Sequence, residues 1–388
     1  MTPTPVSWNA ALARRLSRQA LDRPAPAVGS AGIADLAAAM MGAHAQVLSA
    51  AELSLALRLD GVTRSDVRTA LWADRTLVKT FGPRGTVHLL RAADLPWWTG
   101  ALAAVPGSGG GLPEPARMTP EQTDDVIAAI TDALTGAELT ADELTEAIVA
   151  RTGPWAGDPV MPAFGTMWPR WRQALHTAAH RGVLAFGPDR GRKATYTRPQ
   201  CTPQPARTAL DTLVDGYLRA YGPATSRDFA RWLAAPEPWT ARLFRQLADR
   251  ARIEEVSFES VPAWVAAGDT GFSDFPAGPP RGLRLLPYFD AYVVAGRPRE
   301  RLFPGAARTR ALSGGQAGNH PVLLVDGVAA GVWHQRRSGR RVVLTVEPLA
   351  PLGPRARRLL EAEAERTAAI LEGRAELTVG PVTVGPHA

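Results

Sequence analysis

The sequence contains almost no cysteine and almost no lysine. Of its 388 residues, one is a cysteine, Cys201, and two are lysines, Lys79 and Lys193. A single cysteine excludes an internal disulfide and cysteine-rich zinc sites, and it fits a reducing cytoplasm. No apolar run reaches the ~20 residues that a membrane-spanning helix needs, and Arg14 and Arg15 precede any signal-like apolar stretch. The sequence therefore predicts a cytoplasmic protein with no membrane partner.

Positive charge is in excess and is carried almost entirely by arginine. The chain has 44 Lys+Arg and 37 Asp+Glu, which gives a net charge of +7 and a pI of about 10.2. The planar arginine fork suits phosphates and base edges, which favours a nucleic-acid partner. High-GC coding bias also replaces lysine by arginine without any partner. The excess of charge, more than the preference for arginine, therefore indicates a polyanionic partner.

Three stretches of the chain share a rhythm of helices followed by a hairpin. In the first stretch, the apolar spacing predicts four helices and a pair of strands, near 8–20, 31–41, 50–59, 63–73, 76–81 and 86–90. The turn between the two strands, Gly82 to Gly85, has the chemistry of a wing. A Pro/Gly-rich segment, 106–111, predicts a loop or linker. It lacks the Gly-Lys-Ser/Thr ending of a P-loop, which excludes phosphate cradling there.

The second and third stretches open with helix-capping sequences. Thr119 and Thr140 are predicted N-caps, and the helix after Thr140 should end near Arg151. A third helix is expected from Gly165 to His180, before a hairpin with a basic tip at 187–193. After a proline-rich boundary, two further helices are expected through Leu233 and over about 238–250, and beyond residue 260 short strands separated by Gly/Pro turns predict a small β-barrel.

The sequence thus predicts an α+β protein of tandem winged-helix units, each a helix-turn-helix with a β-hairpin wing, and a C-terminal small β-barrel. The expected divisions are a first winged-helix unit with a catalytic loop, a second and a third winged-helix unit, and a β-barrel with a C-terminal helix. These cover residues 1–105, 112–199, 206–258 and 259–388.

One short segment places an imidazole beside a carboxamide at the end of an alanine-rich helix. His44 and Gln46 flank Ala45, and alternating residues of an extended segment point the same way, so both can face one site while Ala45 packs behind. Alone, a histidine among alanines is most often a satisfied, partly buried side chain. The His44–Gln46 pair becomes informative because its segment occurs together with three others in a particular order and spacing. The four segments are Met41 to Val47, Phe81 to His88, Leu285 to Tyr292 and Val325 to Trp333.

In that order and spacing, the four segments resemble the winged-helix DNA glycosylase family of the azinomycin-resistance enzyme AlkZ. The resemblance runs from about Trp8 to the last helix and implies a C-shaped set of winged-helix units. It implies that His44 and Gln46 are catalytic, as the histidine–aliphatic–glutamine form of the family motif. For family members with the histidine–aliphatic–glutamine form, the resemblance implies removal of bulky adducts of DNA-alkylating natural products, often to protect the organism that produces them. Cross-link unhooking is more associated with the form that has two glutamines.

The chemistry fits so small a set of groups. Alkylation of guanine at N7, or of adenine at N3, makes the base a good leaving group, so water at C1′ needs only to be directed. Gln46 would hold that water, and His44, with a near-neutral pKa, would accept its proton or orient it. Asp290 is a further candidate for electrostatic help or for orienting a catalytic side chain, with a turn-capping carboxylate as the alternative.

The expected partner is double-stranded DNA that carries alkylated purines, bound by a monomer associated with the nucleoid. Basic turns supply the candidate DNA contacts, which are Arg84, Arg190, Arg192, Lys193, Arg336, Arg337 and Arg340. No cofactor and no metal are expected, because His176 and His180 have metal-like spacing but no third ligand. The alternative function is a non-enzymatic winged-helix regulator or adduct-binding protein.

Overall fold

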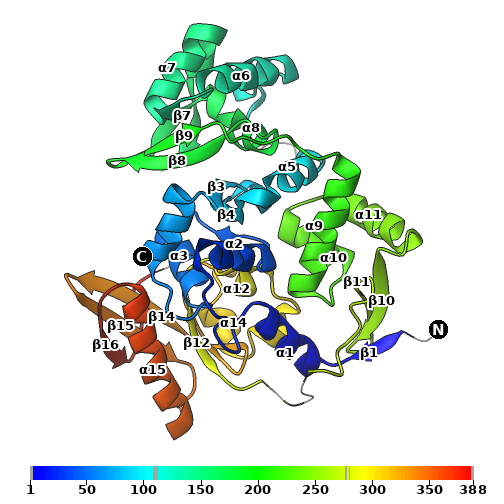
Figure 1. The fold of residues 1–388 in the computed structure, drawn as a ribbon, viewed down its shortest axis with the longest axis vertical. Helices are drawn as coiled ribbons and strands as arrows, with labels where there is room; N and C mark the ends of the chain where they lie inside the picture. The colour runs from blue at the N-terminus through cyan, green and yellow to red at the C-terminus, as the bar shows by residue number, and fades with distance from the viewer. Residues whose placement is uncertain (1–2, 108–111, 164, 276–277, 279, 386–388) are drawn as a thin grey trace.

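The computed structural model describes residues 3–107, 112–163, 165–275, 278 and 280–385. Residues 112–199 form an upper lobe, and the rest of the chain forms a larger lower body (Figure 1). Part of the expected linker, 108–111, lies outside the described residues. Within the described part of the chain, no helix combines the length and the apolar character needed to cross a membrane.

The first unit has the helices and the hairpin that its apolar spacing predicts. Its helices are α1 (Trp8–Arg18), α2 (Gly29–Ala39), α3 (Leu48–Ala56), α4 (Arg64–Arg68), which continues as a π-helical turn (Thr69–Ala73), and α5 (Leu95–Ala103). Its strands, in the sheet order β2-β4-β3, are β2 (Ala43–His44), β4 (Val87–Arg91) and β3 (Leu77–Phe81). Helix α5 and the short strand β2 were not predicted, and β2 carries His44.

The upper lobe has three helices and two hairpins, and its hydrophobic core is formed mainly by the helices and the β8–β9 hairpin. These elements are α6 (Pro120–Ala133), β5 (Glu138–Thr140), α7 (Ala141–Thr152), β6 (Pro159–Ala163), β7 (Thr166–Pro169), α8 (Leu175–His180), β8 (Ala185–Arg190) and β9 (Lys193–Thr197). Both predicted caps are confirmed, because Thr119 and Thr140 each form a capping box at the start of α6 and α7.

The prediction of one helix from Gly165 to His180 is wrong in its first half. Gly165 adopts a φ of 77° beside the β6–β7 hairpin, and β7 ends at Pro169. A proline has no amide hydrogen and restricts the residue before it to extended backbone, so a helix cannot run through this point. The chain turns helical only after Pro169, first as a 3₁₀ segment (Arg170–Ala174) and then as α8.

The third helical stretch also ends in a hairpin, and the N-terminus of the chain completes its sheet. The elements are α9 (Ala206–Tyr221), α10 (Ser226–Leu233), α11 (Glu237–Asp249), β10 (Ile253–Phe258) and β11 (Val261–Ala266). Strand β1 (Thr4–Val6) pairs in parallel with β10, so the sheet order is β1-β10-β11. The hairpin crosses the expected boundary at residue 258.

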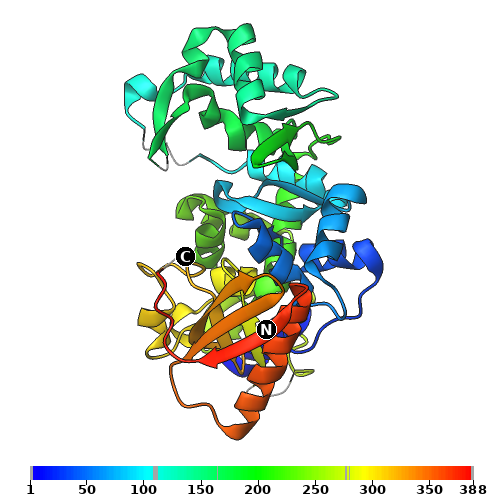
Figure 2. The same cartoon turned by 90° about the vertical axis from the view of Figure 1, so that its left-hand side faces the viewer.

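The C-terminal region is an open sheet, and the expected closed barrel is wrong for the described residues. The strands, in order along the sheet, are β12 (Leu283–Leu286), β13 (Val322–Val325), β14 (Val328–Ser338), β15 (Arg341–Pro348) and β16 (Arg374–Val379). The helices are α12 (Ala291–Ala295), α13 (Arg299–Leu302), α14 (Ala307–Arg310) and α15 (Pro354–Ile370). Strand β16 returns parallel to β15 through α15, which lies against the sheet (Figure 2). Parallel strands need such a crossover connection, which is usually a helix. In the described sheet β12 and β16 are the two edges and do not pair with each other.

Candidate active site

The turn before β2 aims His44 into the lower body. The amide of Gly42 donates to the carbonyl of Ala37 at 2.8 Å, which ends α2 with a reversal of the chain. Gly42 has a φ of 93°, and a Cβ there would lie 2.7 Å from a methyl group of Leu90. The hydroxyl of Tyr221, from α9, donates to the carbonyl of Met40 at 2.6 Å. The third helical stretch therefore holds the turn that leads to His44.

His44 lies in the β2–β4 ladder directly opposite His88. The next residue, Ala45, is 2% exposed, and its amide donates to the carbonyl of Val87 at 2.7 Å. Ala45 thus packs behind the motif as expected. His44 itself is only 7% exposed, whereas Gln46 is exposed, two residues before α3 begins. Gln46 makes no side-chain hydrogen bond to another described residue.

The imidazole of His44 stands between two other rings. It stacks on Phe289 with centroids 4.6 Å apart and an interplanar angle of 24°, and it meets His88 edge-on with centroids 5.0 Å apart. Its Nδ1 is buried and has no hydrogen-bond partner among the described residues. Burial, and to a lesser degree the positive charge of Arg84, lowers the pKa of His44 to about 3. The expectation of a near-neutral pKa is therefore wrong, and His44 is a neutral acceptor at physiological pH.

His88 is fixed in one orientation beneath this site. Its Nδ1 donates to the carbonyl of Thr86 at 2.9 Å, because a carbonyl oxygen can only accept. The ring fits against Gly82, where a Cβ would lie 2.8 Å from Nδ1. Burial lowers the pKa of His88 well below its usual value, and the nearby His44 and Arg84 lower it further. Both histidines of the pair are thus neutral.

The turn between β3 and β4 is buried among the three helical stretches, so it does not project as a wing. Arg84, expected to contact DNA, is half-buried with a φ of 62°, and its Nη1 donates to the carbonyl of Trp232 in α10 at 2.8 Å. Gly85, on the other side of the turn, faces His176 of α8. The tandem packing covers this turn, which no local pattern in the sequence could reveal. Arg84 acts on the site through its charge near His44.

Asp290 is 1% exposed and is held by a buried network. Its two oxygens accept from Nη1 and Nη2 of Arg58, both at 2.8 Å, and from the hydroxyl of Ser54 at 2.7 Å. The carboxylate also accepts from the amide of Tyr292 at 3.0 Å, which caps α12. These contacts match the turn-capping interpretation of Asp290. The same contacts hold Asp290 in place directly after Phe289, and the ring of Phe289 stacks on His44.

Sequence reasoning did not single out Phe289 or Arg58. Phe289 lies inside a quoted segment, but no local pattern pairs it with His44. Arg58 lies 232 residues from Asp290 in the sequence, and an arginine at the end of a helix is ordinarily exposed. Apolar neighbours on both sides of Arg58, at Leu57 and Leu59, are the one local signal that this side chain points into the core.

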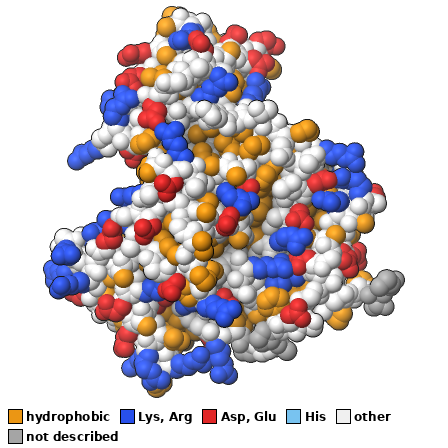
Figure 3. Space-filling model, in the orientation of Figure 1, with side chains coloured by type: hydrophobic (Ala, Val, Ile, Leu, Met, Phe, Trp, Pro, Cys, Tyr) orange, Lys and Arg blue, Asp and Glu red, His pale blue; other side chains and the backbone are white. Residues whose placement is uncertain are grey.

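The basic hairpin tips project on one side of the molecule. The β8–β9 tip holds Arg190, Arg192 and Lys193, and the β14–β15 tip holds Arg336, Arg337 and Arg340; all six are exposed. Figure 3 shows Lys and Arg side chains on both rims of a recess between the upper lobe and the lower body, at the left of the view. Figure 1 places α3, which begins just after Gln46, beside the same recess.

Two of the upper cations already have partners on their own lobe. Arg190 pairs with Glu143 at 2.8 Å and Lys193 pairs with Asp142 at 2.7 Å, in the first turn of α7. Exposed ion pairs of this kind contribute only about 0–1 kcal/mol, so phosphates can replace the carboxylates at little cost. In the lower tip, Nη1 of Arg337 donates to the carbonyl of Leu371 at 3.0 Å.

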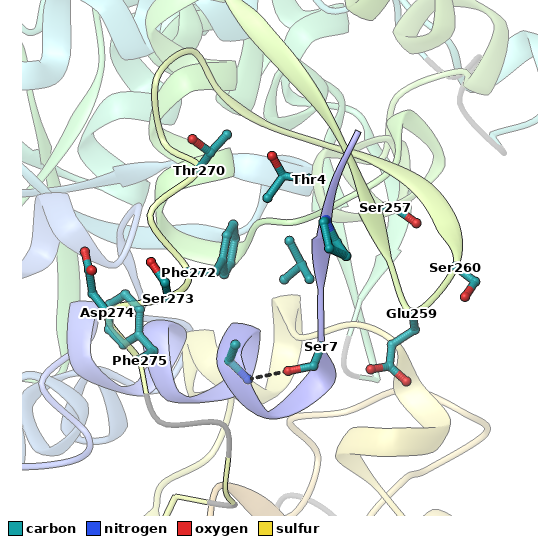
Figure 4. Close-up of a pocket in the computed structure, with 13 residues that line it drawn as sticks. Thr4, Ser7, Ser257, Glu259, Ser260, Thr270, Phe272, Ser273, Asp274 and Phe275 are labelled. Atoms are coloured by element: carbon teal, nitrogen blue, oxygen red, sulfur yellow. Dashed lines mark hydrogen bonds between the residues drawn. The ribbon is translucent and has the colours of Figure 1, made fainter. Parts of the chain in front are cut away.

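A pocket of about 940 Å³ near the N-terminus is separate from these residues (Figure 4). Its polar lining consists of hydroxyls and the carboxylates of Glu259 and Asp274, with no basic side chain. Such a lining repels phosphates, so this pocket is not a DNA site. Within the described ranges, no group of three or more His, Cys, Asp or Glu side chains could hold a metal ion.

Comparisons with known proteins agree with this arrangement. Residues 37–370 match the family described as "DNA glycosylase AlkZ-like". A relative from Streptomyces sahachiroi, named "Interstrand DNA cross-link repair glycosylase", is 32% identical over 348 residues, which are 84% of this chain and 87% of the relative. The solved structure of "Streptomyces sahachiroi DNA glycosylase AlkZ" is similar with a TM-score of 0.77 at 30% identity, covering 98% of this chain and 100% of that one. The likeness thus spans the helical stretches and the C-terminal sheet alike, and the chain belongs to the AlkZ-like DNA glycosylase family.

Proposed function

We propose that this glycosylase hydrolyses the N-glycosidic bond of bulky N7-alkylguanine, and of N3-alkyladenine, and leaves an abasic site. The observation that carries the proposal is the buried, unpartnered Nδ1 of His44, one residue from the exposed Gln46 of the family motif. The proposed biological role is self-resistance or repair against a DNA-alkylating natural product, in the cytoplasm where the DNA lies. No feature of the described residues favours the regulator interpretation.

The reaction needs little acid catalysis because the substrate is already activated. An N7-alkylguanine carries a positive charge, so when the bond between N9 and C1′ breaks, the base leaves neutral with the bonding electron pair. The sugar becomes an oxocarbenium-like cation, and a water oxygen bonds to C1′. That water loses one proton, which balances the charge. What the protein must supply is a positioned water and a site that tolerates the cation.

In this mechanism His44 and Gln46 act as neutral acceptors. The imidazole lone pair of His44 and the carboxamide oxygen of Gln46 each accept a hydrogen bond from the attacking water. A pKa of about 3 for His44 makes the ring a weak base, so it orients the water and the proton leaves only as the bond to C1′ forms. Positioned groups of this kind contribute about 10²–10⁴ in rate. Asp290 acts on the site indirectly, through the loop that carries Phe289.

The reaction ends with hydrolysis, without a lyase step. A lyase step would need an amine at the sugar, and the chain has two lysines. Lys193 lies at the β8–β9 tip, and the Lys79 ammonium lies 4.8 Å above the ring of Phe186. Strand β4 separates β3, which carries Lys79, from β2, which carries His44. Neither lysine therefore reaches a base held at His44.

Of the three helical stretches with hairpins, the upper lobe would bind the duplex as a winged-helix module, because its β8–β9 tip is basic and exposed. The net charge of +7 and the basic rims of the recess suit a polyanion (Figure 3). The recess lies on a single chain, so one monomer is sufficient for binding. Bulky adducts favour a site at this open recess over extrusion of the base into a tight pocket.

A panel of synthetic duplexes tests this function. Each duplex carries one adduct, from N7-methylguanine to an N7-guanine linked to a polycyclic intercalator, and an N7-guanine interstrand cross-link is added because a relative is named for cross-link repair. Free alkylated base is measured by mass spectrometry, and abasic sites are measured by alkaline strand cleavage. We expect equal amounts of both products, with the highest rates for bulky monoadducts. Tight binding to every duplex without release of any base would contradict the proposal.

A further inference from the structure

The ring of Phe289 is the surface on which the imidazole of His44 rests. The stacked arrangement, with 4.6 Å between centroids and 24° between planes, leaves no room for water between the two rings. Phe289 follows β12, in the C-terminal region, whereas His44 belongs to the first unit. Two distant parts of the chain therefore meet at this contact.

The backbone of Phe289 is strained, and its neighbours maintain that strain. Phe289 has a φ of 55°, which a bulky side chain rarely adopts and which costs on the order of 1 kcal/mol or more. Its amide donates to the carbonyl of Gly318 at 2.9 Å, and a Cβ on Gly318 would lie 2.9 Å from Cδ1 of the Phe289 ring. Next to it, Asp290 is bound to Arg58 and Ser54. Strain held in place from both sides is typical of functional sites.

Two titratable or charged groups lie near His44 besides its stacked partner. His88 faces it from β4, and Arg84 lies near it from the turn before β4. Asp290, the residue after Phe289, forms an ion pair with Arg58, so these two charges compensate one another. Phe289 therefore supplies an apolar surface to one face of His44, while His88 and Arg84 lie near it from other elements.

We infer that Phe289 is a positioning residue for base release, which excludes water from one face of His44 and keeps its ring neutral and fixed. This role rests on the proposed function of His44 as the group that orients the attacking water. Leucine at position 289 would remove the flat surface and admit water, so the pKa of His44 would rise from about 3 towards 6.5. The protonated ring could no longer accept a hydrogen bond from water.

Single-turnover base release across pH tests the inference. Phe289→Leu and Phe289→Met remove the ring, Phe289→Tyr restores it, and Phe186→Leu is the matched control in a tilted ring cluster of the upper lobe. We expect Phe289→Leu to lower the rate at pH 7 about 10- to 100-fold, with duplex affinity unchanged within about twofold. Phe289→Tyr and Phe186→Leu should remain within about threefold of the wild type.

The pH profile separates positioning from a merely structural role. The wild-type rate should be flat from about pH 5 to 8, because His44 stays neutral throughout. In Phe289→Leu the rate should fall further below about pH 6.5, as His44 becomes protonated. A variant that keeps the wild-type rate and a flat profile overturns the inference. So does a loss of rate that Phe289→Tyr fails to restore. Phe289→Met retains a flexible apolar side chain, and it provides the same comparison if the leucine variant does not fold.

A second measurement on the free protein needs no glycosylase activity. The full chain is labelled with ¹³C at histidine Cε1, and the His44 signal is assigned by its loss in His44→Ala. We expect no titration of His44 above pH 5 in the wild type and a titration midpoint raised by at least one pH unit in Phe289→Leu. Identical titrations overturn the inference. Absence of base release by the wild type would overturn the proposed function alone, since the titration still reports whether Phe289 controls His44.

Discussion

Replacing Asp290 by alanine should destabilise the protein more than any single change at an exposed site. The substitution leaves Arg58, which is fully buried, with only the carbonyl and hydroxyl oxygens of Ser54 as partners among its present contacts, and with no counter-charge there. The Nε of Arg58 is already buried without a partner among the described residues. The variant also loses the cap on α12, where Asp290 accepts from the amide of Tyr292.

The magnitude follows from these two losses. Breaking one side of a buried ion pair costs about 3–5 kcal/mol, because a buried charge remains uncompensated. Loss of an N-cap adds about 1 kcal/mol. We therefore expect the free energy of unfolding to fall by about 4–6 kcal/mol. Arg58→Met combined with Asp290→Leu removes both charges together, and it should cost at least 2 kcal/mol less than Asp290→Ala alone.

The free energy of unfolding of both variants is measured by equilibrium unfolding in urea, followed by tryptophan fluorescence. Base release is measured separately, at a temperature where each variant remains folded. A loss of less than 1 kcal/mol in Asp290→Ala would refute the assignment of Asp290 to the scaffold. If that small loss came with a base-release rate more than 100-fold lower, Asp290 would have to touch the reacting atoms. A double variant less stable than Asp290→Ala would likewise refute the buried-charge argument.

Three further outcomes follow from the structure. The folded-state pKa of His44 lies near 3 and its unfolded value near 6.5, so only the unfolded chain takes up this proton between those values. The contribution of His44 to stability should therefore fall by about 2 kcal/mol from pH 7 to pH 5, and urea titrations should find the pH dependence smaller by that amount in His44→Asn. Arg336→Gln and Arg340→Gln should each reduce the slope of log affinity against log salt by about 1 in anisotropy titrations, leaving the rate at saturation unchanged; an unchanged slope would exclude a phosphate contact. Thr225→Ala removes the capping box of α10 and should cost about 1 kcal/mol in urea unfolding, whereas a neutral result would show that packing alone holds that helix.

Local features of the fold could be predicted because they depend on neighbouring residues. Thr119 and Thr140 each cap a helix through a residue three positions further on, so the capping sequence itself determines the contact. The β8–β9 hairpin forms for the same reason, with two residues between Arg190 and Lys193. Features that depend on distant residues could not be predicted. The barrel was wrong because β12 and β16, which would have to pair to close it, are the two edges of the described sheet, and pairing between such distant strands depends on tertiary packing.

The candidate site shows the same division. His44 and Gln46 could be chosen from the sequence, and Ala45 does pack behind them. The pKa of His44 could not be predicted from the sequence. It depends on burial beneath Phe289 and on the charge of Arg84, residues that only the folded chain brings close to His44. Arg84 was expected at a DNA-contacting tip because its turn has the sequence of a wing. The packing of α8 and α10 against that turn covers it instead.

The central claim is that His44 and Gln46 carry the chemistry and that DNA binding resides elsewhere. Its most direct test compares the wild type with His44→Ala, Gln46→Ala and the control His334→Ala, whose histidine lies on β14. Single-turnover release of a bulky N7-alkylguanine and duplex affinity are measured on the same preparations. We expect a loss of release of about 10²-fold or more in the first two variants, with affinity within about twofold, and wild-type behaviour in His334→Ala. Undiminished release by His44→Ala or Gln46→Ala would contradict it.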